Sequence, residues 1–291
     1  MDYYLSQLIN GICQGSIYAL MAIGFSVVFG VVGLVTFTHG EVIMIGAFAA
    51  FYAFELVGTN LLIGIVASFA ASAMIGVFVY KVCYERFLDA PEYISLICTI
   101  GVSMLLKSLA QIIFGPNNKP MLDVVPNHFF GWGVVGITLI QIIVIATVAM
   151  VSALLYFFLN RTRWGIMLRA VSQDRKAAAL MGINVKRMIL TGNCIGCGLG
   201  GVAGMLLAVY YQTLVATMGG SAGMKAFAAA VLGGLSDVPC AALGGLLLGI
   251  IENLGITFSS ASFRDIFAFV FLLIVLLIKP EGFAHKKGAR A

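Results

Sequence analysis

The chain has 291 residues, of which 61% are apolar and only 10% are charged, with a formal net charge of +5. Its mean hydropathy is +1.06. The charges are unevenly spread, because residues 3–40, 124–160 and 188–224 contain no Asp, Glu, Lys or Arg. Each of these stretches exceeds the ~20 residues that a helix needs to cross a bilayer. The composition excludes a soluble enzyme, a nucleic-acid-binding protein and a disulfide-stapled secreted domain, and it predicts an integral membrane protein.

Apolar runs bounded by charges or by Gly, Asn and Pro clusters predict the membrane spans in chain order. The predicted spans are residues 5–30, 41–56, 61–80, 93–114, 137–159, 189–211, 239–258 and 265–278. The first run has no Lys or Arg ahead of it, unlike a cleaved signal peptide, so we expect it to stay as a helix. We therefore predict an all-α polytopic fold of about eight or nine spans, in a single transmembrane domain over residues 1–291.

Two basic segments indicate the orientation. Residues 161–187 and the tail 279–291 together hold eleven of the 17 Lys and Arg residues, so both segments are expected in the cytoplasm. An even number of crossings must separate them, but only three long spans lie between. The missing crossing is assigned to residues 223–234, which are too short to span alone and are expected to form a broken helix. Counting back through five spans places the N-terminus outside.

The irregular stretch 31–40 resembles the second interrupted region weakly. Leu34-Val35 aligns with Leu214-Val215, and Gly40 aligns with Gly220. The two copies would face opposite sides of the membrane, as an inverted repeat requires, although bias in an Ala- and Gly-rich chain is the alternative explanation.

Several charged residues fall inside or at the ends of apolar spans, where charge is costly and therefore indicates function. Glu55 and Glu252 lie near predicted outer ends, so an interfacial position is expected for both. The others are assigned either to the permeation path or to a buried pair. With the polar residues of the first irregular stretch, the candidate path residues are Thr36, Thr38, His39, Glu41, Lys107 and Lys225.

Small residues recur every four positions in two spans and predict close helix packing. We expect contacts within the chain, with a subunit interface as the alternative. The packing residues are Gly192, Gly196, Gly200, Gly204, Gly245 and Gly249.

The sequence favours no catalytic or metal site. It has three His residues and no visible nucleophile–base pairing, and the CxxC spacing of Cys194 and Cys197 lies in an uncharged apolar stretch. No Lys follows a Gly, so the chain has no P-loop, and any ATPase that drives it must be another chain. We expect neither a bound metal nor an enzymatic activity.

The loop 161–187 predicts a short surface helix of about ten residues. Ser172 is the expected N-cap, Asp174 suits the first turn, and Gly182 is the expected stop. A solvated linker held near anionic lipid is the alternative. The helix, however, also carries an apolar contact face, formed by Ala177, Ala178, Leu180 and Met181.

Motifs in four places resemble one family. They are the Arg-Ala-x3-Asp-x3-Ala-x3-Gly-Ile-Asn pattern of residues 169–184, Thr-Phe-Thr-His-Gly-Glu at 36–41, the Gly-Met-Lys-Ala-Phe run opening 223–234, and Leu-x2-Lys-Pro-x-Gly at 276–282. In these motifs the chain resembles the smaller, "H"-type permease subunit of branched-chain amino acid ABC importers, a bacterial inner-membrane protein with a fold like that of type II ABC importers.

The resemblance implies partners and a role for the loop helix. The partners would be a second related permease in a heterodimer, two cytoplasmic ATPase subunits that carry ATP and Mg²⁺, an extracytoplasmic binding protein, and membrane lipid. This chain would hold no cofactor. The loop helix would be the coupling helix that docks on the ATPase, through Ser172, Gln173, Asp174, Arg175, Ala177, Ala178, Met181 and Gly182.

Two other functions stay open at this point. A similar branch of the family handles urea or short amides, and these motifs do not separate the branches. An ion-coupled secondary transporter or a channel would instead need its own coupling site, for which Glu41, Lys107, Lys225 and Glu252 are the candidates.

Overall fold

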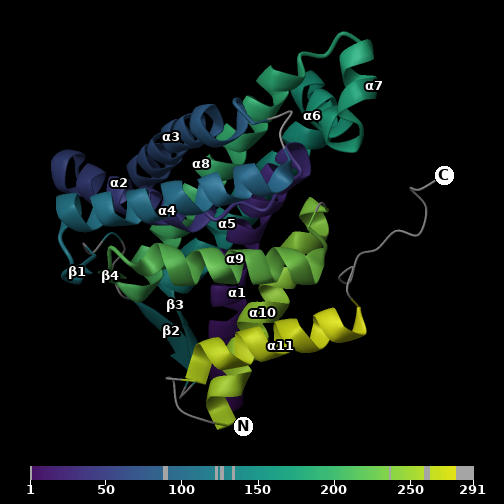
Figure 1. Ribbon diagram of the computed structural model, residues 1–291. Coiled ribbons are helices and arrows are strands. Elements are labelled where there is room, and N and C mark those ends of the chain that lie inside the picture. Colours follow the sequence, from purple (N-terminus) through teal and green to yellow (C-terminus); the bar gives the residue numbers. More distant parts are fainter. Residues whose placement is uncertain are drawn as a thin grey trace.

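The computed structural model describes residues 2–87, 91–121, 124, 128–132, 135–235, 237–258 and 263–279. Helices account for most of this chain, and long ones cross one another at varied angles (Figure 1). The long helices are α1 (Asp2–Val32), α2 (His39–Val57), α3 (Leu61–Val79), α4 (Glu92–Phe114), α5 (Leu139–Arg161), α8 (Val185–Tyr211) and α10 (Val238–Phe258). The shorter elements are a π-helical turn η1 (Tyr80–Tyr84), α6 (Arg163–Gln173), α7 (Arg175–Leu180), α9 (Met218–Gly233) and α11 (Arg264–Ile278).

Every predicted span corresponds to a helix. Among the described residues, 7 helices are long and apolar enough to cross a membrane. The helices α9 and α11 have 16 and 15 residues, so at 1.5 Å per residue each is about 24 Å long or less. Together with the 7 long helices they account for the nine segments that the sequence predicts as crossings, but at this length neither covers a ~30 Å hydrocarbon layer by itself.

The prediction of a broken helix at residues 223–234 is wrong. In the structure α9 begins at Met218 and continues to Gly233 as one α-helix. Its first turns are glycine-rich, which lowers helix propensity by about 1 kcal/mol per glycine and looks like an interruption in the sequence. The structure uses these glycines for close contact with α2, because a Cβ on Gly40 would lie 2.2 Å from the Gly219 carbonyl oxygen.

The irregular stretch near residues 31–40 is present. Helix α1 ends at Val32, Gly33 has a φ of +70°, and residues 33–38 are not α-helical before α2 begins at His39. Thr36 and Thr38 are nonetheless buried. The segment therefore turns these two hydroxyl-bearing side chains into the protein, whereas Gly33 and Phe37 stay exposed, Phe37 at 52%.

The packing of helices supports an inverted repeat in which α1–α4 correspond to α8–α11. Helix α1 packs along α10, and its counterpart α8 packs along α3. Contacts of α2 with α3 are matched by contacts of α9 with α10, and α2 meets α9 directly. Two units related by a pseudo-two-fold axis in the membrane plane would give these reciprocal pairs.

The spaced glycines of α8 and α10 lie against helices of the same chain. A Cβ on Gly204 would lie 2.0 Å from the Ile43 carbonyl oxygen of α2, and one on Gly196 would lie 2.6 Å from the Gly24 carbonyl oxygen of α1. On α10, a Cβ on Gly249 would lie 2.3 Å from Gly15. These small residues let the helix backbones approach closely.

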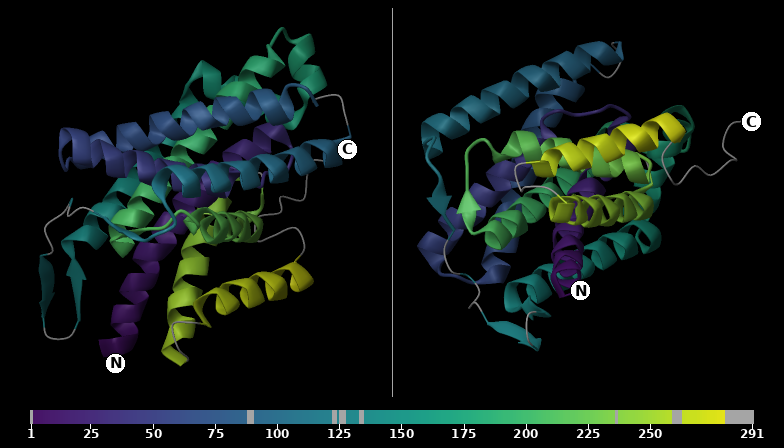
Figure 2. Two further views of the ribbon diagram at one scale, coloured as in Figure 1. Left: turned by 60° about the vertical axis from the view of Figure 1, so that its left-hand side comes forward. Right: turned by 90° about the horizontal axis from the view of Figure 1, so that it is seen from below.

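The molecule has two distinct ends. Helices α6 and α7 form one end, whereas the N-terminus lies at a distance from them (Figures 1 and 2). Near the N-terminus, strands β2 (Phe129–Trp132) and β3 (Val135–Thr138) form an antiparallel hairpin. Strands β1 (Lys119–Pro120) and β4 (Thr213–Leu214) pair away from α6 and α7 and join the loops that follow α4 and α8. The basic tail predicted at 279–291 lies outside the described residues beyond Lys279.

Candidate functional site

Two short helices, not one, follow α5. Helix α6 ends at Gln173, and Asp174 is extended, with φ −151° and ψ 110°, before α7 begins. The Asp174 Oδ1 atom accepts hydrogen bonds from the backbone amides of Lys176 at 2.8 Å and Ala177 at 3.0 Å. The predicted N-cap at Ser172 is therefore wrong, because an ionised carboxylate caps the helix and Ser172 Oγ donates to the Arg169 carbonyl oxygen instead.

Helix α7 ends as the sequence predicts. Gly182 has a φ of +80°, which an L-residue with a side chain rarely adopts. The Ile183 amide donates to the Ala178 carbonyl at 3.1 Å, and the Gly182 amide donates to the Ala179 carbonyl at 3.0 Å. This pair of bonds is the Schellman motif, so both ends of the six-residue helix are fixed.

The apolar face of α7 is divided between the protein interior and the surface. Ala178 is 4% exposed and packs in the core, so the prediction that it meets a partner is wrong. Leu180 and Met181 are 90% and 83% exposed, and Ala177 is also exposed. We call Ala177, Leu180 and Met181 the docking tip. Gln173 and Asp174 are exposed beside it.

A cavity of about 390 Å³, here called the central cavity, lies between the irregular stretch, α4 and α9. Thr36 and Glu41 border it on one side, and Gly219 and Gly223 border it on the other. Its walls are mostly apolar, with Ser103 of α4 as a further polar group. The size lies within the range of ligand-binding pockets. The two segments singled out in the sequence therefore meet at one cavity.

The other candidate path residues lie elsewhere. Thr38 and His39 are buried, and the His39 ring packs edge-on against Phe25 with centroids 5.5 Å apart. Lys107 is exposed on α4, the helix that also supplies Ser103, and although it does not border the cavity its charge acts on the Glu41 carboxyl group. Of the six candidates, the structure brings only Thr36 and Glu41 to the central cavity.

Lys225 belongs to an ionic cluster in which Glu252 is fully buried and the Asp265 side chain is 55% exposed. Its Nζ atom lies 2.8 Å from Glu252 Oε1, 2.8 Å from Asp265 Oδ1 and 3.1 Å from the Tyr18 hydroxyl oxygen. The Glu252 side chain is 0% exposed, so its expected interfacial position is wrong. Buried charges are tolerated when they are paired and hydrogen-bonded, as these are.

The cluster joins residues of five helices and is balanced in charge. Arg264 of α11 contributes the second cation, with its Nε atom 3.4 Å from Glu252 Oε1 and Nη1 donating to the Tyr211 hydroxyl at 2.8 Å. Two cations thus face the two anions Glu252 and Asp265. The three ammonium protons of Lys225 have three acceptors, so we interpret the cluster as a structural connection between α1, α9, α10 and α11, with α8 joined to it through Tyr211.

Sequence reasoning missed the neutral members of this cluster. Gln14 and Tyr18 lie one turn apart on α1, and Gln14 Oε1 accepts from Asn253 Nδ2 at 2.8 Å. The signal available in the sequence was the four-residue spacing of Asn10, Gln14 and Tyr18 in a helix that has no charge after Asp2, which indicates one polar face.

No group of three or more His, Cys, Asp and Glu side chains that could hold a metal ion occurs among the described residues. All six cysteines lie in that part of the chain as free thiols.

Known proteins resemble this chain over nearly its whole length. A family described as the permease component of branched-chain amino acid transport systems matches residues 7–277. The high-affinity branched-chain amino acid transport system permease protein LivH of Escherichia coli is 36% identical over 96% of this chain and 95% of its own. Its counterpart BraD of Pseudomonas aeruginosa is 38% identical with the same coverage. The ribose import permease protein RbsC of Escherichia coli is 25% identical over 95% of this chain and 86% of its own.

Proposed function

The chain belongs to the family of permease components of branched-chain amino acid transport systems, and from this premise we propose that it is a membrane subunit of an ATP-binding-cassette importer. Its cargo would be leucine, isoleucine and valine. The observation that carries the proposal is identity of 36% and 38% over 96% of the chain to two permeases of that transport system.

The docking tip suits an ATPase partner. An exposed Leu and Met at the end of a rigidly capped helix leave apolar area that water does not favour, and such patches mark protein contacts. We assign the tip to a groove on the ATPase, with Gln173 and Asp174 at its rim. ATP and Mg²⁺ would be bound by two ATPase subunits, and this chain would bind neither.

The remaining partners and the orientation follow from the same proposal. A second, related permease would complete the membrane pore, and an extracytoplasmic protein would deliver the amino acid. The end formed by α6 and α7 would face the cytoplasm of a bacterial inner membrane, because seven Lys and Arg residues lie in residues 161–187. The N-terminus and the β2–β3 hairpin would then face outward.

The central cavity suits an aliphatic cargo that is bound weakly. Its walls are mostly apolar, which favours a branched side chain, while Glu41 and Ser103 offer few partners for an ammonium and a carboxylate together. A zwitterion held tightly in a dry site would need both charges matched. We therefore assign selection of the substrate to the binding protein. The similarity to a permease named for ribose import supports a scaffold that does not by itself fix the cargo.

Stimulated ATP hydrolysis tests the proposed function. The chain would be co-expressed with its second permease and ATPase, purified as a complex and placed in nanodiscs with the binding protein. We expect leucine-loaded binding protein to stimulate hydrolysis, and unloaded binding protein or free leucine alone to have little effect. A chain that forms no complex with an ATPase would contradict the importer, and stimulation by urea but not by leucine would contradict the cargo.

A further inference from the structure

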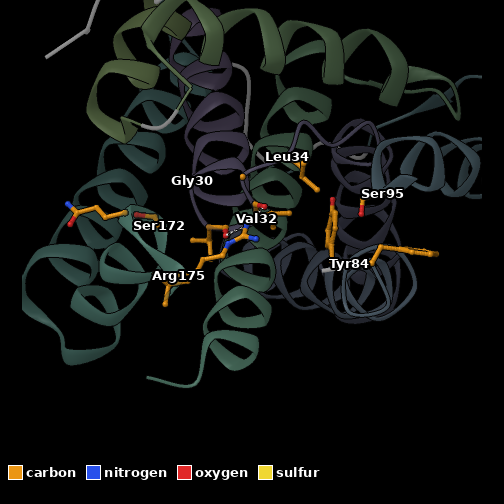
Figure 3. Close-up of a pocket in the computed structure, with 12 residues that line it drawn as sticks. Gly30, Val32, Leu34, Tyr84, Ser95, Ser172 and Arg175 are labelled. Atoms are coloured by element: carbon orange, nitrogen blue, oxygen red, sulfur yellow. Dashed lines mark hydrogen bonds between the residues drawn. The ribbon is translucent and has the colours of Figure 1, made fainter. Parts of the chain in front are cut away.

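Arg175 points toward the end of α1 rather than toward a partner. It is the first residue of α7, but its guanidinium reaches back to α1, where Nη2 donates to the carbonyl oxygens of Val31, at 3.2 Å, and of Val32. Figure 3 shows the Arg175 side chain beside Val32, whereas Ser172 lies apart from that contact. The residue assigned from sequence to the ATPase surface is therefore an internal contact.

The placement of this cation is favourable for α1 and not for α7. A positive charge at the first turn of a helix opposes the helix dipole, so Arg175 does not stabilise α7 through its charge. At the other end of a helix the last four carbonyls lack intrahelical donors and attract cations. The guanidinium meets this need at the C-terminus of α1, with a charge-assisted bond that is stronger than a neutral one.

The backbone of α1 is shaped for the contact. Gly33 follows Val32 and has a φ of +70°. A Cβ on Gly33 would lie 3.2 Å from Arg175 Nη2, so glycine both allows the turn and leaves room for the guanidinium. The contact lies beside a cavity of about 420 Å³ whose wall includes Tyr84 and Ser172, so α7 is not packed tightly on every side.

The chain continues from this contact directly to the central cavity. After Gly33 it is not α-helical until His39, and Val35 and Thr36 already border the central cavity. On the other side, Arg175 is one residue from the cap Asp174 and five residues from the exposed Leu180 of the docking tip. One side chain thus connects the surface assigned to the ATPase with the segment that bounds the path.

We propose that Arg175 transmits movement of α7 to the segment 33–38 by holding the last carbonyls of α1. This inference rests on the proposed function, because it assigns a role within the coupling that an ABC importer needs. Arg175 is a positioning residue in this account: it touches neither the cargo nor the ATPase. Displacement of α7 on ATP binding moves Gly33 and the residues after it, and so changes the wall of the central cavity.

The test separates ATP hydrolysis from uptake in the whole complex reconstituted in proteoliposomes with binding protein and leucine. Arg175→Gln removes the charge, and we expect it to assemble and retain basal hydrolysis while leucine uptake per ATP falls roughly tenfold or more, the factor that one charge-assisted bond represents. Arg175→Lys keeps the charge but cannot bond two carbonyls as a guanidinium does, so it should give an intermediate ratio. Lys186→Gln, at an exposed position outside α7, is the control and should match the wild type.

The outcomes distinguish this inference from the proposed function. If the wild-type complex shows no ATP-dependent leucine uptake, the proposed function fails. If the wild type transports leucine and Arg175→Gln has the same uptake per ATP, the role of Arg175 is wrong and the proposed function stands. If Arg175→Gln does not assemble, Arg175→Lys decides, because an assembled complex with a wild-type ratio would also overturn the role of Arg175.

Discussion

Lys225 lies in the apolar helix α9 and is largely buried, so an isolated charge there would be strongly disfavoured. Two carboxylates and a tyrosine hydroxyl accept hydrogen bonds from the Lys225 ammonium group. With Arg264 included, the cluster contains two cations and two anions and has no net charge. An ion-coupled transporter would need a charge that is free to change partners during transport. A cation with a full set of acceptors is better suited to holding helices in place.

We expect two substitutions in the ionic cluster of Lys225 to destabilise the folded protein to different extents. Lys225→Met leaves the buried Glu252 carboxylate with two longer contacts, to Arg264 at 3.4 Å and Gln14 at 3.3 Å, so we expect a loss of about 3–5 kcal/mol, as for other broken buried pairs. Glu252→Gln should be milder, because Lys225 keeps Asp265 at 2.8 Å. Thermal unfolding of the purified protein measures both, with Glu55→Gln at an exposed position as the control. Equal melting temperatures for Lys225→Met and the control would show that the pair is not structural.

At the scale of elements, α2 and α9 meet through glycines. Gly40 of α2 and Gly219 of α9, which form this contact, also border the central cavity. We expect Gly40→Ala to force the helices apart, because its Cβ would lie 2.2 Å from the Gly219 carbonyl oxygen. The variant should lose leucine uptake and accumulate poorly in the membrane.

Gly101→Ala is the control for this contact. It lies on α4 and does not border the central cavity, a Cβ there meets nothing within 4 Å, and alanine favours a helix by about 1 kcal/mol over glycine. Uptake and membrane yield should stay at wild-type levels. Equal impairment of the two variants would mean that the α2–α9 contact does not limit function.

Helix α7 predicts where an ATPase attaches. Leu180→Asp places a charge at a position that is 90% exposed, so it should leave the fold intact while it weakens assembly with the ATPase. Pull-down of the ATPase with the tagged variant measures this, with Lys186→Gln as an exposed control outside α7. Full recovery of the ATPase with a normally folded Leu180→Asp protein would place the docking surface elsewhere.

Apolar runs predicted the positions of the long helices well, because a helix is one of the few structures that pairs every backbone N–H and C=O group inside a membrane. The errors concern tertiary contacts. The glycines of α9 resemble a helix break in the sequence, but in the structure they contact Gly40 of α2. Ala178 and Arg175 lie in a loop that the sequence predicts to be exposed, but Ala178 is buried and Arg175 bonds to α1. Periodicity and capping preferences describe one helix at a time, so they could not show which face of α7 is covered.

At the scale of the whole molecule, charge bias predicts a definite topology. The structure places α6 and α7 away from β1 and β4, so residues at these two places should be reachable from opposite sides (Figure 1). In a Cys-free variant, we expect an impermeant thiol reagent added to intact cells to label Lys119→Cys and to leave Ser172→Cys unlabelled. The reverse pattern would invert the topology and remove α7 from the ATPase side.

The existence and approximate bounds of the long helices were foreseeable from hydropathy. The ionic cluster and the central cavity were not, because each joins residues more than a hundred positions apart. Lys225 meets Tyr18, and Glu41 shares a cavity with Gly219, through an arrangement of helices that one sequence does not specify. The weak internal similarity gave the only indication that the segments near Gly40 and Gly220 are related, and the reciprocal packing of α1–α4 and α8–α11 supports it.

Uptake of labelled leucine into proteoliposomes tests the central claim most directly. The vesicles would contain this chain, its second permease and the ATPase, with binding protein outside and ATP enclosed. We predict accumulation that requires both ATP and binding protein and that a proton or sodium gradient cannot replace. Leucine uptake driven by such a gradient without ATP would contradict an ABC importer, and it would return Glu41 and Lys225 to consideration as a coupling site.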